Sequence, residues 1–528
     1  MIPIIDLFAG PGGLNEGFSS VGEDTNQPQF RTVASFEMDF HACQTLRLRS
    51  AFRALKRKGS VPRSYYEFIA GAKSWEQFSS EPEIAEVLAE AAKEIHQIEL
   101  GPANRAKTDE LIRAALEEAL DRDGDDWVLI GGPPCQAYSM AGRSRRRNDK
   151  AFEQDKKHFL YREYLRIIEN FSPSVFVMEN VKGLLSSTNA GKGMFSRILN
   201  DLSNPKDGLH YEVRSLVVTG SPAELDPHDF IIKAENYGVP QRRHRVILLG
   251  VRADLLHRMP RSILEQSDQV TVRMAIEDLP KIRSGIAPVR DNSWEKWSAI
   301  RRAVDLRLAN DDVAAADKTS QPILDTGGPF SRQYVTPEPK TEFQRWLLDP
   351  RIKGVTLHEA RRHMAGDLER YGYLARKAIS LSKNPTIVAL PDDLQPAHVN
   401  IGRPDTPFVD RFRVQLWDAP STTVVSHIAK DGHYYIHPDS EQMRSLTVRE
   451  AARLQSFPDN YFFQGSRTQQ YSQVGNAVPP FLARQIAIKV AQTLQLQAPV
   501  HEGARSETRE SVLPSPEQDI QQSSALAF

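Results

Sequence analysis

The chain has few cysteines, no excess charge of either sign and no long apolar stretch. Its 528 residues include only two cysteines, Cys43 and Cys135, which argues against a disulfide framework or a cysteine-based zinc site and favours a reducing compartment. The formal net charge is −1, so a nucleic-acid partner would have to meet a local basic patch. No apolar run is long enough to span a bilayer, and the strand-like N-terminus leaves no room for a signal peptide. We expect a cytoplasmic protein without a membrane partner.

Short apolar runs alternate with helical patterns through the first half of the chain. Tyr161, Tyr164, Leu165 and Ile168 follow the i, i+3, i+4, i+7 spacing of an amphipathic helix. Strands that alternate with helices indicate an α/β fold with a mostly parallel, doubly wound sheet. Ligands of such folds bind at the carboxyl ends of the strands. The expected strands are 2–5, 32–36, 127–130, 175–178, 211–218 and 246–251.

Changes in pattern suggest how the chain divides into domains. Residues 64–122 are rich in Ala, Glu and Leu, and we interpret them as a helical insertion. From 271 to 440 the periodicity loosens, which indicates a second, loop-rich domain. Ordered periodicity returns over 440–495, and the polar, Pro/Ser/Glu-rich sequence of 496–528 predicts a disordered tail.

Cys135 lies in GGPPCQAYS, directly after the apolar run 127–130. A thiol on the loop that leaves a buried strand can be held rigidly and can draw on backbone N–H groups that favour its thiolate. The alternative is a structural cysteine that fills the core. The two glycines and two prolines before Cys135 favour the nucleophile, whereas core packing is the expected role of Cys43.

The segment DLFAGPGGLNEGF, residues 6–18, predicts a tight glycine turn between a strand and a helix. Gly10, Gly12 and Gly13 would let a ligand approach the backbone. The segment lacks the GK[ST] of a P-loop and the spacing of G-x-G-x-x-G, which disfavours a nicotinamide-dependent oxidoreductase. Glu37, after the next strand, is placed like an acid that accepts ribose hydroxyls, although an exposed helix-capping acid fits equally well.

Two further groups of charged residues follow or precede predicted strands. Glu179 in MENV would lie across the crevice from Cys135, where a desolvated carboxyl can share a proton with a ring nitrogen. A salt-bridged structural acid is the alternative. In QRRHR, residues 241–245, period two places Arg243 and Arg245 on one side of a strand, where they can hold a phosphate or an acidic group, or simply form a solvated cluster.

In this order, DLFAGPGG, GGPPCQAYS, MENV, QRRHR, LTVREAARLQSFPD and QVGNAVPP resemble the DNA (cytosine-5) methyltransferase family, from Asp6 to about residue 490. The resemblance implies S-adenosylmethionine as methyl donor and a class I methyltransferase fold. It also implies that 440–495 complete the catalytic domain of 1–270, and that 271–440 form the target-recognition domain. The implied cofactor-binding residues are Phe8, Ala9, Gly10, Gly12, Gly13, Leu14, Glu37, Met38, Pro134, Asn476 and Val478.

The family chemistry assigns a role to each catalytic candidate. The Cys135 thiolate would add to carbon 6 of cytosine and make carbon 5 nucleophilic, with Glu179 hydrogen-bonding at N3 and Arg243 and Arg245 orienting the base. The target base must leave the duplex, at roughly a few kcal/mol. Residues 136–150 would close over it, and a second basic stretch at 360–377 could be either a DNA contact or a surface helix. The implied DNA-binding residues are Gln136, Ser139, Arg143, Arg145, Arg146, Arg147 and Gln241.

The sequence departs from the family where an acid usually contacts adenine. The candidates are Asp121, Asp123, Asp125 and Asp126, among which the sequence does not decide. Two other functions stay open: an RNA cytosine-5 methyltransferase, and a catalytically idle DNA-binding module. The family's commonest setting implies double-stranded DNA as partner, host protection in a bacterial restriction–modification system and a separate endonuclease, and we expect a monomer.

Overall fold

The computed structural model describes residues 1–123, 125–134, 160–185, 188–189, 192–221, 224–258, 262–288, 292–310, 322–396 and 411–494. The predicted catalytic residue Cys135, the predicted DNA contacts between 136 and 147, and the predicted tail lie outside these residues.

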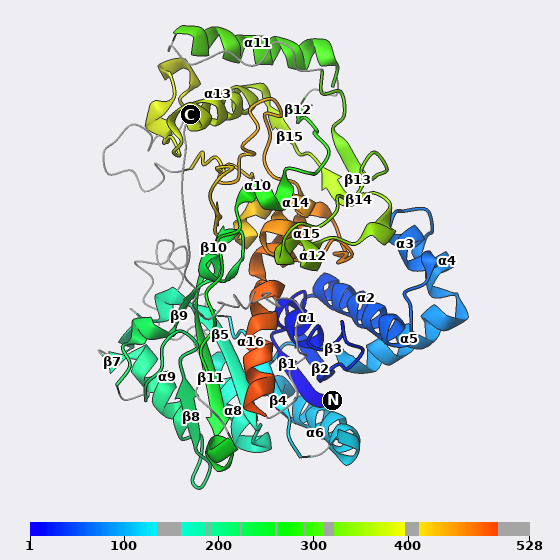
Figure 1. Ribbon diagram of the computed structural model, residues 1–528, viewed down its shortest axis with the longest axis vertical. Helices are drawn as coiled ribbons and strands as arrows, with labels where there is room; N and C mark the ends of the chain where they lie inside the picture. The colour runs from blue at the N-terminus through cyan, green and yellow to red at the C-terminus, as the bar shows by residue number, and fades with distance from the viewer. Residues whose placement is uncertain are drawn as a thin grey trace, which may run out of the picture.

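Within the described residues, eight strands form the central sheet in the lower half of Figure 1. The first five strands of its order run parallel, whereas β11 is antiparallel to its neighbours β5, β8 and β9. In spatial order the strands are β3 (Ile95–Gln97), β2 (Phe30–Glu37), β1 (Ile2–Leu7), β4 (Val128–Gly131), β5 (Val175–Val181), β11 (His244–Arg252) and β8 (Tyr211–Arg214), with β9 (Ile231–Lys233) also on β11. Each predicted strand overlaps one of these.

Helices cover both faces of the sheet, which confirms the predicted α/β class. Because side chains alternate along β1, Ile4 joins one hydrophobic core and Ile5 joins the other. Leu14 and Ile486 of the covering helices share the first core, and Ile112 and Tyr164 share the second. The helices of the first face are α1 (Gly13–Ser19) and α16 (Pro480–Thr493), and those of the second are α6 (Arg105–Asp123), α8 (Leu160–Phe171) and α9 (Met194–Ser203). The predicted helix at 161–168 corresponds to α8.

Helix α16 brings the C-terminal end of the described chain back to the first helix. It packs along α1, and in Figure 1 it crosses in front of the sheet. Pro480 opens α16 at the first helical position, where its missing N–H costs nothing. The two halves of the chain therefore build one core around β1.

The predicted insertion at 64–122 is wrong for its second half. Helices α3 (Arg63–Ile69) and α4 (Trp75–Ser79) do lie outside the sheet, on the right in Figure 1. However, α5 (Pro82–Glu94) leads into β3, which pairs in parallel with β2, and α6 follows as the crossover helix. The strand was missed because it has three residues and two of them, His96 and Gln97, are polar.

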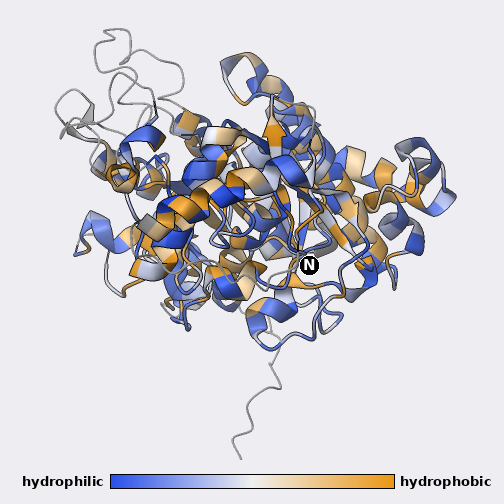
Figure 2. Cartoon of the chain, turned by 90° about the horizontal axis from the view of Figure 1, so that it is seen from above, coloured by the Kyte–Doolittle hydropathy of each residue, from blue (hydrophilic) through white to orange (hydrophobic). Residues whose placement is uncertain are grey.

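The C-terminal half forms the upper part of Figure 1 and has two cores of its own. One core joins α10 (Val272–Ile276), α12 (Glu342–Leu347), α14 (Val448–Leu454) and α15 (Arg467–Asn476), and the other joins α11 (Trp294–Asn310) to α13 (Ala365–Leu381). In Figure 2 hydrophobic and hydrophilic residues alternate along the helices, as expected where one face of a helix covers a core. Besides short 3-10 helices, the described residues also form α2 (Phe40–Arg57) and the short strands β6 (Thr188–Asn189), β7 (Lys192–Gly193), β10 (Gln241–Arg242), β12 (Gly285–Ala287), β13 (Gly327–Ser331), β14 (Val355–Glu359), β15 (Arg362–Met364) and β16 (Ser421–Thr422).

No helix among the described residues is both long and apolar enough to cross a membrane.

Candidate active site at the carboxyl edge of the sheet

The register of the parallel strands brings four predicted segments to one edge of the sheet. Leu7 pairs with Phe36 on one side and with Gly131 on the other, and Gly131 pairs with Met178. The residues that come next along each strand therefore emerge together, as predicted for the glycine turn, Glu37, the GGPPC loop and Glu179.

The glycine turn adopts backbone angles and contacts that require glycine. Gly10 and Gly12 have φ values of 55° and 88°, and Phe8 also lies at positive φ, 55°. A Cβ on Gly13 would lie 2.1 Å from the carbonyl oxygen of Val478. One side of the turn is therefore accessible to a ligand, and the other side packs against the C-terminal segment at Val478.

The Glu37 carboxylate organises this turn. It accepts backbone N–H groups from Gly10, Met38 and Asp39, each at 2.8 Å. Burial raises the pKa of Glu37, and these hydrogen bonds oppose the rise. The cap of α2 is Asp39, whose side chain accepts from the N–H of Ala42 at 2.8 Å, so Glu37 is not the helix-capping acid considered as an alternative.

An exposed apolar surface follows Glu37. Met38 is 63% exposed and Phe40 is 50% exposed. Gln97, at the end of β3, pairs with Glu37 in the sheet and donates from Nε2 to the carbonyl of Met38 at 3.5 Å. The sequence did not point to Gln97 because its strand is too short to produce a pattern.

The aspartates considered for the adenine contact do not reach this edge. Asp125 and Asp126 precede β4, and Asp126 accepts from the hydroxyl of Ser174, which precedes β5, at 2.6 Å. Asp125 and Asp126 therefore lie at the amino end of β4, at the edge of the sheet opposite the glycine turn. Asp121 and Asp123 belong to the last turn of α6, which leads into the same opposite edge.

Glu179 and Arg245 form an ion pair at the edge. Their Oε1 and Nε atoms are 2.8 Å apart, and both side chains are about one-seventh exposed, at 13% and 15%. Arg245 also donates to the carbonyl of His244 at 2.9 Å. A Cβ on Gly132 would lie 3.0 Å from Oε2 of Glu179, so the glycine leaves the loop after β4 room to pass this carboxylate.

Asn180 ties the same two strands together. Its Nδ2 donates to the carbonyl of Pro133 at 3.4 Å, which connects MENV to GGPPC. Pro134 is exposed and is the last described residue before Cys135. The sequence predicted a role for Glu179 in MENV but none for Asn180.

Arg243 and Gln241 lie in the interior instead. Arg243 is 3% exposed and donates to the carbonyls of Val424 and Gly475 at 2.9 and 3.3 Å. Burial, and secondarily the charge of Arg245, lowers its pKa to about 9. Gln241 is fully buried and bonded to the 424 and 454–455 segments. Because both side chains are buried, we expect Arg243 and Gln241 to stabilise the fold rather than to make the predicted contacts with the base and the DNA.

The C-terminal blocks are bonded to this framework. Gln455 donates to the carbonyls of Val474 and Ala477 at 2.9 and 2.7 Å, and so shapes the turn before Val478. The hydroxyl of Tyr461 donates to the carbonyl of Pro11 in the glycine turn. Asn476 is exposed at the end of α15, whereas Val478 is buried against Gly13.

Cys43 has the predicted packing role. It is fully buried, and burial raises the pKa of its thiol to about 12. It is therefore not a competing nucleophile. Among the described residues, no group of three or more His, Cys, Asp or Glu side chains is arranged to hold a metal ion.

A glycine turn, a partly buried acid beside it and an acid–arginine pair at the carboxyl edge of a mostly parallel sheet are the features of a class I methyltransferase fold. A solved structure from an E. coli prophage, assigned as a DNA modification methyltransferase, shares this fold at a TM-score of 0.50 and 21% identity, covering 94% of this chain and all of that one.

The family model for C-5 cytosine-specific DNA methylase matches residues 105–492. The chain is also 33% identical over 509 residues to the type II methyltransferase M.Bpa9945I of Bacillus paralicheniformis, covering 93% of this chain and 99% of that protein. It is 32% identical over 404 residues to the type II methyltransferase M.AgeI of Thalassovita gelatinovora, covering 69% and 83%. The chain belongs to the C-5 cytosine-specific DNA methylase family.

Proposed function

We propose that this enzyme methylates carbon 5 of a cytosine flipped out of double-stranded DNA, through a covalent bond to Cys135. The observation that carries the proposal is the Glu179–Arg245 pair, 2.8 Å apart, beside Gly132 in the loop that leads from β4 to Cys135. An acid and a cation at this place can bind the polar edge of a pyrimidine while the thiol reaches its ring.

The reaction needs the cysteine because carbon 5 of cytosine is a weak nucleophile. Addition of the Cys135 thiolate to carbon 6 breaks the ring's aromaticity and places electron density on carbon 5. A hydrogen bond from the Glu179 carboxyl at N3 stabilises the added charge, and Arg245 orients both the carboxyl and the base. Loss of the carbon-5 proton after methylation then expels Cys135 and regenerates the thiolate.

The glycine turn fits S-adenosylmethionine, which supplies an electrophilic methyl group when bound. Gly10 and Gly12 leave the backbone open to close approach. Oε1 of Glu37 accepts two N–H groups and Oε2 accepts one, so Oε2 keeps a lone pair for a ribose hydroxyl. Met38 offers an exposed apolar surface to the adenine, and Gln97 replaces the acid expected at its edge.

The remaining assignments follow the same resemblance. We assign residues 1–270 with 440–495 to catalysis, 271–440 to target recognition, and the arginines at 143, 145, 146 and 147 to phosphate contacts. The relatives are type II methyltransferases, which supports protection of host DNA beside a separate endonuclease. We further propose that the enzyme is a monomer and acts in the bacterial cytoplasm.

Bisulfite sequencing of DNA from cells that express the chain tests the activity and locates the methylated site. A duplex that carries 5-fluorocytosine at that site tests the mechanism, because fluorine cannot leave carbon 5 as a proton does. With S-adenosylmethionine present, a stable protein–DNA adduct should form, and peptide mapping should place it on Cys135.

The matched control is Cys43→Ala, which removes the other, buried thiol and should leave the adduct in place. Cys135→Ala should abolish both adduct and methylation while duplex binding survives. Methylation of tRNA in preference to duplex DNA would replace the proposed substrate, and an adduct in the Cys135→Ala protein would exclude the proposed nucleophile.

A further inference from the structure

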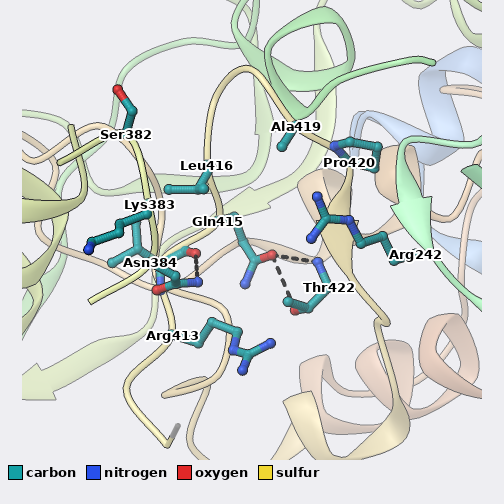
Figure 3. A pocket seen from close by; sticks show the side chains of 11 residues that line it. Arg242, Ser382, Lys383, Asn384, Arg413, Gln415, Leu416, Ala419, Pro420 and Thr422 are labelled. Atoms are coloured by element: carbon teal, nitrogen blue, oxygen red, sulfur yellow. Dashed lines mark hydrogen bonds between the residues drawn. The ribbon is translucent and has the colours of Figure 1, made fainter. Parts of the chain in front are cut away.

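A cavity of about 310 Å³ lies where the strand that leads to Arg245 meets the second half of the chain. Figure 3 shows its lining. Arg242 comes from β10, Ser382, Lys383 and Asn384 come from the segment after α13, and the remaining wall is formed by residues 413–416, 419, 420 and 422. The cavity therefore joins residues that are far apart in sequence.

The uncharged polar side chains of the cavity hold its walls. Gln415 accepts from the N–H and the hydroxyl of Thr422 at 2.9 and 3.2 Å and donates to the carbonyl of Tyr434 at 2.8 Å. Asn384 donates to the carbonyl of Val414 at 2.8 Å and accepts from its N–H at 3.1 Å. Because these amides are committed to the backbone, Arg242 and Lys383 are the lining residues that we consider for binding a ligand.

Among the described residues, the lining carries positive charge and no carboxylate. Arg242, Lys383 and Arg413 contribute cations, and the first two side chains are exposed. Asp418, next to the wall, is held by Arg273 at 2.7 Å. A second cavity, of about 360 Å³, differs because Glu359 lies among its arginines, 3.7 Å from Arg467. The first cavity is therefore the better site for an anion.

The cavity is tied to the candidate active site by a short stretch of backbone. Arg242 pairs with Thr422 across β10 and β16, and its carbonyl accepts from the hydroxyl of Thr423 at 2.5 Å. Arg245, which contacts Glu179, is three residues further on. Three residues span at most about 11 Å, so Arg242 and Arg245 are close enough to meet the same short stretch of a DNA strand.

We propose that this cavity, with Arg242 and Lys383 as its cations, binds a backbone phosphate of the DNA strand that carries the target cytosine, close to the flipped nucleotide. The inference rests on the proposed function. Arginine holds a phosphate through two parallel N–H donors, and lysine adds a point charge. A phosphate anchored here fixes the strand while the base turns into the site, and it carries no sequence information itself.

The test compares the full-length wild type with an Arg242→Gln/Lys383→Gln double variant, which removes both charges and keeps polar side chains of similar reach. Binding to a duplex oligonucleotide with the methylated site is measured over a series of salt concentrations. Each lost phosphate contact lowers the log–log salt slope by roughly 0.9, so the slope should fall by about 1 to 2. KM for DNA should rise, and the methylated sequence should stay the same.

The matched control is Arg197→Gln/Lys206→Gln, which removes the same two charges from exposed positions on α9 and in the loop before β8, outside both cavities and outside 271–440. Its slope should match the wild type. A methylphosphonate scan then locates the contact: neutralising one phosphate near the target cytosine should weaken the wild type, and the same substitution should leave the Arg242/Lys383 variant unaffected.

An unchanged slope in the double variant, or equal sensitivity of both proteins at every methylphosphonate position, overturns the phosphate site. If the wild type still methylates cytosine in either case, the proposed function stands and only this site is lost. If the wild type neither binds nor methylates duplex DNA, the proposed function fails first and this inference falls with it.

Discussion

Two glutamate–arginine pairs show how the sheet and the C-terminal half use the same chemical groups differently. Glu179 meets Arg245 through one pair of atoms at 2.8 Å, with both side chains partly exposed. Glu450 meets Arg444 through two bonds of 2.6 Å and also accepts the N–H of Thr447 at 2.7 Å, and both side chains are 1% exposed. The first pair has bonding capacity left for a ligand, and the second is saturated.

The environment of Glu450 explains this difference. Burial would raise its pKa, but the adjacent Arg444 guanidinium outweighs burial and holds the pKa of Glu450 well below its usual range. Glu450 also completes the capping box of α14 with Thr447. Both acids lie in sequence blocks that resemble the family's, yet one is partly exposed at the carboxyl edge of the sheet and the other is buried in the fold.

The largest expected effect is on the rate of methyl transfer, and it should follow from a change in the Glu179–Arg245 pair only. Glu179→Gln should slow methyl transfer by about 10² to 10⁴-fold, because a general acid–base contribution is lost at the base. Its unfolding free energy should change by less than about 1 kcal/mol, since the side chain is partly exposed and makes one ion pair. Single-turnover methylation and urea unfolding measure the two quantities. Normal turnover in this variant would remove Glu179 from the reaction.

The reverse result is expected for the saturated pair. Glu450→Gln leaves the Arg444 charge buried without its partner, which should lower the unfolding free energy by about 3 to 5 kcal/mol. Activity per folded molecule should be kept at a temperature where the variant remains folded. Urea unfolding with an active-site titration checks both points. A stable variant with lost activity would mean that Glu450 acts in the site after all.

The sheet could be predicted from the sequence because its central strands are continuous apolar runs. Ile2 to Ile5 and Val175 to Met178 are buried on both faces and admit no other interpretation. The edge strand β3 could not be predicted, since three residues with His96 and Gln97 among them carry no such pattern. As a result Gln97 was missed, and the aspartates of 121–126 were considered in its place.

Positions within one block could not be separated by sequence. In QRRHR, Arg245 reaches Glu179, whereas Gln241 and Arg243 are buried by segments that return from 424, 455 and 475. Those contacts span more than 180 residues of chain, so no local pattern announces them. Exposure of a charged residue depends on what packs over it, and this is decided by the tertiary fold.

The two regions should also respond differently to acid. Burial lowers the pKa of His363 to about 3, with His433 as a smaller cause. The unfolded pKa is about 6.5, so the unfolded chain binds more protons below that pH and acid favours unfolding. Between pH 6.5 and 5 this histidine alone costs about 2 kcal/mol of stability. His358 and His437, with pKa values lowered by burial to about 4 and about 3, add to the effect.

Replacing His363 isolates its contribution to the pH dependence of the unfolding free energy. His363→Gln keeps a polar partner for Ser445, whose hydroxyl lies 3.1 Å from Nε2. Between pH 7 and pH 5 the variant should lose about 2 kcal/mol less stability than the wild type, as measured by urea unfolding at both values. An identical pH dependence in the two proteins would show that folding leaves the pKa of His363 unchanged.

The smallest effect concerns a buried acid of the sheet, and its sign is opposite. Asp6 on β1 is 1% exposed, and neither carboxylate oxygen has a hydrogen-bond partner among the described residues. Burial, and secondarily the charge of Glu37, raises its pKa well above the usual range. The stability that depends on this proton is complete below pH 4 and is lost as the pH rises toward the folded pKa.

Asp6→Asn places an uncharged side chain of almost the same shape at this position, so the folded protein no longer has to bind a proton there. At pH 8 the variant should be more stable than the wild type by about 1 to 2 kcal/mol, and the gain should vanish near pH 4, where the unfolded aspartate is protonated as well. Urea unfolding at the two pH values measures the difference. A loss of stability at pH 8 would mean that the folded protein keeps Asp6 charged, because the asparagine then gives up a favourable interaction of the carboxylate. In that case the contrast with His363 would disappear, and both regions would be weakened by acid.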